Sequence, residues 1–62
     1  MSRRVEVVYG DNQRGIAVVS DEEADRFRDE VTSADPLLVW VTVGGLTMRR
    51  GSVISIDIRE HR

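Results

Sequence analysis

Cysteine and lysine are absent from this 62-residue chain, and His61 is its only histidine. Disulfide bonds and the usual cysteine or histidine zinc sites are therefore excluded as sources of stability. A core of this size supplies only about 3–5 kcal/mol of net stability without reinforcement. Self-association is the simplest reinforcement left, and we expect no cofactor and no metal.

Long apolar runs are also missing, since none approaches the roughly 18–20 residues that cross a bilayer. The chain reads Met1-Ser2-Arg3-Arg4 and passes directly into an alternating pattern, without the apolar core and small-residue cleavage site of a signal peptide. We expect a cytoplasmic protein, or part of an assembly formed in the cytoplasm, with no membrane contact.

Recognisable combinations of catalytic groups are lacking as well. The serines have no candidate general base in the sequence other than the terminal His61. The acidic residues gather on the outward face of one predicted helix, whereas an acid/base pair needs a cleft. The glycines lack the lysine and the following helix of a phosphate-binding loop. We expect a protein that is not an enzyme and has no small-molecule ligand.

The composition indicates a folded domain, because 40% of the residues are hydrophobic and 32% are charged. The first predicted element is a β-hairpin over residues 3–20. Val5, Val7 and Tyr9 alternate with polar or smaller residues, residues 10–15 read as a loop of about five or six residues, and an apolar run resumes over 16–19.

A helix over residues 21–32 follows. Ser20 stands three residues before Glu23, which predicts a capping box in which the Glu23 carboxylate also reaches back to the Ser20 amide. Ala24, Phe27 and Val31 form the apolar stripe of this helix.

Residues 36–59 read as a β-meander after the break at Asp35-Pro36. A central strand over 37–43 is apolar on both faces, and Gly44-Gly45 predicts a type I′ turn into a strand over 46–49. The last strand, 53–59, alternates with Ile54, Ile56 and Ile58 inward, and residues 60–62 read as a frayed tail.

The predicted fold is a single α+β domain over residues 1–62, in the order ββαβββ, with one helix packed on a mainly antiparallel sheet of four to five strands. A small, partly closed β-barrel with one helix is the alternative.

One helix covers only one face of such a sheet, yet Leu38 and Trp40 lie on the opposite face of the central strand, with Val8 and either Ala17 or Val19 beside them. A tryptophan offers on the order of 200 Å² for burial, and soluble monomers seldom expose large apolar patches. We therefore predict a protein interface at Leu38, Trp40 and Val8, through which the chain self-associates or docks into a larger assembly. In the barrel alternative, Trp40 is covered within the chain.

The arginines suggest a second function class. Outside the helix there are seven arginines and five acids, which makes the sheet mildly basic although the net charge is −2. A nucleic-acid-binding or regulatory module is the alternative function, and its predicted phosphate contacts are Arg4, Arg14, Arg49 and Arg50.

The C-terminal half, which reads PLLVWVTVGGLTMRRGSVISIDI over residues 36–58, resembles a class of small uncharacterised proteins of actinobacteria and their phages. The resemblance implies a small accessory or structural role, with phage proteins among the candidates, and provides no functional residues to carry over.

Overall fold

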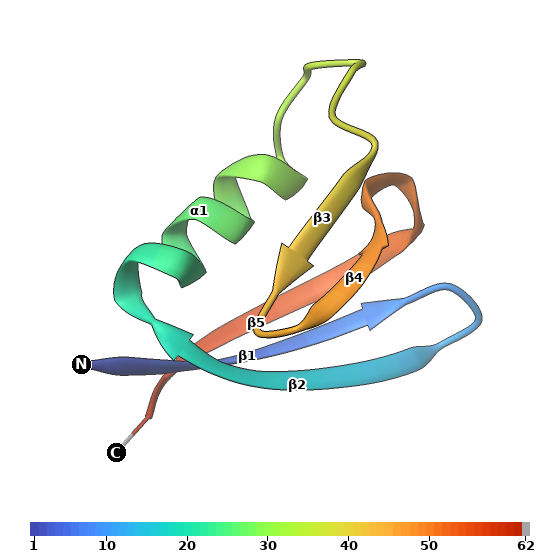
Figure 1. Cartoon of the computed structure of the whole chain (residues 1–62). Helices are drawn as coiled ribbons and strands as arrows, with labels where there is room; N and C mark the ends of the chain where they lie inside the picture. The colour runs from blue at the N-terminus through green and yellow to red at the C-terminus, as the bar shows by residue number, and fades with distance from the viewer. Residues whose placement is uncertain (62) are drawn as a thin grey trace.

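A computed structural model describes residues 1–61 and shows one helix and five strands in the predicted order (Figure 1). The elements in chain order are β1 (Ser2–Tyr9), β2 (Gln13–Ser20), α1 (Asp21–Val31), β3 (Trp40–Val43), β4 (Leu46–Arg49), a short 3-10 helix η1 (Arg50–Ser52) and β5 (Val53–His61). The α+β class is confirmed. No helix within these residues is long and apolar enough to cross a membrane.

The strands form two antiparallel sheets instead of the single sheet that the sequence predicted. β1 is the centre of a three-stranded sheet with the order β2-β1-β5, and β3 pairs with β4 as a separate hairpin. The meander prediction is therefore wrong at its last step, because β5 pairs with β1 and not with β4. The physical reason is length: β1 offers β5 a partner over eight residues, whereas β4 has four. No closed barrel forms among the described strands.

The core lies between two layers. The three-stranded sheet is one layer, and α1 lies beside the β3–β4 hairpin in the other (Figure 1). Ala24 and Phe27 project from α1 into this space, where Phe27 is fully buried, and Val31 packs at its margin. The predicted helical stripe is confirmed. The other buried apolar residues are Val5, Val7, Ala17, Val19, Val41, Val43 and Met48.

The helix begins as predicted but with one contact different. The Ser20 hydroxyl accepts a hydrogen bond from the Glu23 amide at 3.1 Å, which satisfies one free donor of the first turn. The Glu23 carboxylate does not return to the Ser20 amide. It accepts from the Gly44 amide at 2.8 Å, because the turn of the β3–β4 hairpin lies against the start of α1.

Two strand ends differ from the prediction. The first hairpin loop has three residues, since Gly10 and Asn12 take positive φ angles of 58° and 66° and let β2 begin at Gln13. Glu60 and His61 belong to β5, where they pair with Arg3 and Ser2 and are no frayed tail. Arg62, the last residue of that predicted tail, lies outside the described residues.

A β-bulge changes the face on which one isoleucine lies. Val8 pairs with Ser55 but Tyr9 pairs with Val53, so Ile54 is an extra residue without a partner on β1. Ile54 was predicted inward and is 60% exposed, whereas Ile56 and Ile58 pack against the core as predicted. The bulge therefore moves one large apolar side chain to the surface.

Candidate protein-interaction surfaces

An apolar segment before and at the start of β3 contains three of the seven exposed large hydrophobic side chains among the described residues. The Leu37–Trp40 segment (Leu37, Leu38, Val39 and Trp40) was predicted as strand, but β3 begins only at Trp40. Leu37 is 87% exposed, Val39 47% and Trp40 57%, while Leu38 is half-buried. Trp40 points outward because Val41 and Val43 occupy the buried face of β3.

A turn holds this segment away from the core. The Asp35 carboxylate accepts from the Leu37 amide at 3.0 Å, and the Asp35 carbonyl accepts from the Leu38 amide at 3.2 Å. Asp followed by Pro is a typical start for such a turn. The local sequence therefore fixes the backbone that presents Leu37 to solvent.

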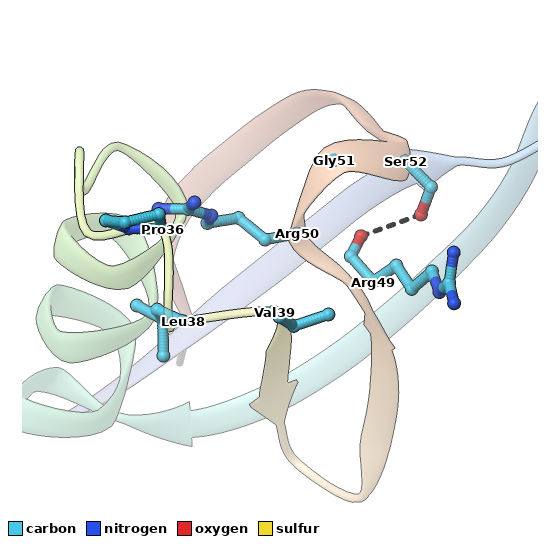
Figure 2. Close-up of a pocket in the computed structure, with 7 residues that line it drawn as sticks. All are labelled: Pro36, Leu38, Val39, Arg49, Arg50, Gly51 and Ser52. Atoms are coloured by element: carbon cyan, nitrogen blue, oxygen red, sulfur yellow. Dashed lines mark hydrogen bonds between the residues drawn. The ribbon is translucent and has the colours of Figure 1, made fainter.

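A cleft of about 460 Å³ adjoins the segment, between Pro36, Leu38 and Val39 on one side and residues 49–52 on the other (Figure 2). The Arg50 amide donates to the Val39 carbonyl at 2.8 Å, which joins the two walls. Figure 2 shows the Arg50 side chain extending towards Pro36 and the Arg49 side chain directed away from it.

The two arginines at this cleft are engaged within the chain. The Arg50 guanidinium donates to the Ser33 carbonyl, and the Arg49 guanidinium carbon lies 5.7 Å from the centre of the Trp40 ring. A cation over an indole face is attracted by the ring's quadrupole. Arg49 therefore orients Trp40, and Arg50 ties η1 to the end of the helix region.

The predicted interface residues do not form one surface. Leu38 and Trp40 belong to the layer of the β3–β4 hairpin, whereas Val8 lies on the outer face of the three-stranded sheet, opposite the buried Val5 and Val7. Ala17 and Val19 are buried in the core and do not share the face of Trp40. The prediction for the first strand thus placed Val8 on the correct face of its own sheet, but that face is on the other side of the molecule.

The outer face of the three-stranded sheet carries two apolar side chains that the sequence did not single out. Ile16 and Val18 on β2 are each about half exposed. Their segment is apolar at every position from 16 to 19, so the pattern gave no sign of which residues face out. The pairing with β1 settles it, because Ile16 lies opposite Glu6 and Val18 opposite Arg4.

The four predicted phosphate contacts are divided between two surfaces. Arg49 and Arg50 lie at the cleft beside Trp40. Arg4 and Arg14 lie on the outer face of the three-stranded sheet, where Arg4 is 4.0 Å from the Glu6 carboxylate and Arg14 pairs across from Val8. The four side chains do not form one basic patch.

A third surface, not predicted from the sequence, runs beside β5. A groove of about 380 Å³ separates the last turn of α1 from this strand. Residues 28, 31 and 32 of the helix region line one side and residues 53–56 and 58 line the other. Ile54 lines this groove because of the bulge, and no pattern in the sequence predicts a bulge at this position.

Within residues 1–61 no cluster of three or more histidine, cysteine, aspartate or glutamate side chains is placed to hold a metal ion. Three aspartates, Asp21, Asp25 and Asp57, are paired with arginines at 2.9–3.3 Å. These three acids have arginine partners on the surface. Only Asp25 among them lines a hollow, an open one of about 510 Å³ that it shares with Glu22, Asp29 and Glu30.

Comparison with known proteins adds no relative: no family model, no curated protein and no solved structure matches this chain. The functional argument therefore rests on the surfaces described above.

Proposed function

We propose that this chain is a small, non-catalytic interaction protein that self-associates, or docks into a larger protein assembly, through the Leu37–Trp40 segment. The observation that carries the proposal is the exposure of Trp40 and Leu37 in one short segment that a turn holds outward. Tryptophan is enriched among the residues that dominate the energy of protein interfaces.

The surroundings of Trp40 suit a binding contact. Arg49 lies over the indole ring and is itself exposed, so an arginine and a tryptophan are offered together. Both residue types are enriched in interface cores. The cleft of about 460 Å³ beside Leu38 and Val39 offers room for a partner's side chain.

The nucleic-acid alternative has less support. Two of its four arginines are engaged by Trp40 and the Ser33 carbonyl, and a third is close to the Glu6 carboxylate. The net charge of −2 gives no general attraction to phosphate backbones.

Trp40→Ala tests the proposal. In its self-associating form, the chain is expected to show a mass that rises with concentration in light scattering, and the substitution should weaken that association by tenfold or more. The fold should lose less than about 1 kcal/mol, because the indole is largely exposed already.

Val18→Ala is the matched control, since Val18 is also an exposed apolar residue but lies on β2. The two variants and the wild type are compared over one concentration series at low and moderate salt. Superimposable curves for wild type and Trp40→Ala would contradict a self-contact through the Leu37–Trp40 segment.

A further inference from the structure

β5 lies at an edge of the three-stranded sheet. β1 pairs with one of its edges, and the other edge has no strand beside it among residues 1–61. A free edge presents a row of unpaired backbone N–H and C=O groups to any strand that approaches. At nine residues, β5 is long enough for a second strand to pair along it.

The groove beside this edge provides space for side chains. Its helix wall contributes Val31, and its strand wall contributes isoleucines, of which Ile54 is exposed and Ile56 and Ile58 are partly buried. Strand addition generally combines backbone pairing at an edge with pockets for alternate side chains. Both requirements are met at β5.

The charged side chains of β5 favour a second copy of β5 as the strand that pairs along this edge. Asp57 and Arg59 are exposed on the outer face of β5, and they form an ion pair at 2.9 Å within the chain. In an antiparallel pair of two β5 strands centred on Ile58, Asp57 of each copy lies opposite Arg59 of the other. Opposite charges across two strands stabilise the pairing, and the symmetry provides the contact twice.

The neighbouring registers lack this complementarity. Centring the pair on Asp57 places two aspartates directly opposite each other, and centring it on Arg59 places two arginines opposite each other. Like charges in directly opposed positions are destabilising. Among the antiparallel registers centred on residues 57, 58 and 59, only the one centred on Ile58 therefore places opposite charges across from each other.

We propose that two copies of the chain join β5 to β5 in this register, around a two-fold axis through Ile58. Two three-stranded sheets then become one continuous sheet, with the strand order β2-β1-β5-β5-β1-β2. Such a contact is self-complementary and closed, as is usual in homodimers. This inference goes beyond the proposed function, because it concerns β5 and not the Leu37–Trp40 segment.

The same symmetry also brings the apolar surfaces together. An axis perpendicular to the sheet keeps both α1 helices on one face, so the two grooves lie side by side over the joined strands. Ile58 meets Ile58 of the second copy on the groove side. The dimer thereby buries apolar side chains of the groove that are exposed in the monomer.

β2 is the other free edge of the three-stranded sheet and is less suited to this role. Its one charged residue is Arg14, so it has no pair of opposite charges that would favour one register for a second strand.

Charge exchange between two variants tests the proposal. Asp57→Arg alone and Arg59→Asp alone each turn both attractive contacts of the dimer into repulsive ones, so each variant should dimerise at least about tenfold more weakly than the wild type. An equal mixture of the two variants should form a heterodimer, because each then faces the opposite charge. Native mass spectrometry separates this heterodimer from either homodimer.

Mixing the two variants also distinguishes a contact between chains from the ion pair within one chain. Both substitutions abolish the ion pair within the chain, and mixing does not restore it, so recovery on mixing reports a contact between chains. Circular dichroism checks that both variants are folded, and Val18→Lys on β2 is the edge control, expected to dimerise like the wild type.

Full-strength dimers of either single variant, failure of the mixture to form heterodimers, or loss of the dimer in Val18→Lys would each overturn the proposal. Trp40→Ala leaves β5 unchanged, so its result bears on the proposed function alone.

Discussion

At the scale of single residues, Gly44 joins three parts of the fold. Its amide donates to the Glu23 carboxylate of α1, and a Cβ atom built on it would lie 2.6 Å from the Ala17 Cβ of β2. Its φ of 52° belongs to the left-handed region. The turn of the β3–β4 hairpin is thus held against both the helix and the three-stranded sheet at one position.

Gly44→Ala should therefore destabilise the protein by about 2–4 kcal/mol, since the methyl group adds a steric clash to the cost of a left-handed alanine. Gly45→Ala is the matched control: its φ is 87°, but an added Cβ would meet nothing within 4 Å. It should cost only about 1–2 kcal/mol. Urea denaturation followed by circular dichroism measures both, and equal losses would show that contact with Ala17 does not matter.

At the scale of elements, β2 combines a free edge with an apolar sequence. Ile16 and Val18 are half exposed, and Arg14 is the only charged residue in the strand. Uncharged, β-branched edge strands are templates for uncontrolled pairing. This is the segment from which aggregation on heating should start.

Val18→Lys should slow that aggregation, and it should lower the free energy of unfolding by no more than about 1 kcal/mol, because the new charge faces solvent but lies directly opposite Arg4 on β1. Thr47→Lys adds the same charge to an exposed position of β4 and serves as the control. Turbidity during heating is the measurement. If both variants aggregate alike, net charge and not the β2 edge governs the process.

Elements set by neighbouring residues were predictable from the sequence, and pairings between distant segments were not. Ser20 determines where α1 begins, and Gly44-Gly45 determines the β3–β4 turn, because both act over a few residues. The choice of β1 as partner for β5 depends on relative strand lengths across the whole chain. The bulge at Ile54 depends on that pairing, so the alternating pattern did not predict that Ile54 is exposed.

The candidate surfaces were likewise predictable where they depend on one strand and not where they depend on contacts between distant segments. The outward direction of Trp40 follows from alternation within its own strand, and the sequence predicted it. Grouping Trp40 with Val8 required both strands to lie in one sheet, and the structure places them in two. The groove beside β5 was missed because it needs the packing of α1 against a strand that is distant in sequence.

At the scale of the whole molecule, apolar surface remains on several sides of a thin two-layer fold. The radius of gyration of 10.9 Å is that of a compact domain of this length. The Leu37–Trp40 segment, the Ile16 and Val18 pair and the β5 groove lie outside the core. Burial of part of this surface against another chain, as we propose, would add to the stability of a domain this small.

If β5 pairs with β5, stability depends on concentration, because unfolding then includes dissociation of the dimer. The melting temperature of the wild type should rise by about 5–7 °C for each tenfold increase in concentration, as expected for a unit of two such chains. Arg59→Asp should show a smaller slope over the same range, since it weakens pairing at the edge while leaving the core intact. Differential scanning calorimetry over a concentration series measures both slopes. A melting temperature of the wild type that does not change with concentration would mean that the monomer carries the whole stability of the fold and that the free edge of β5 is tolerated in solution.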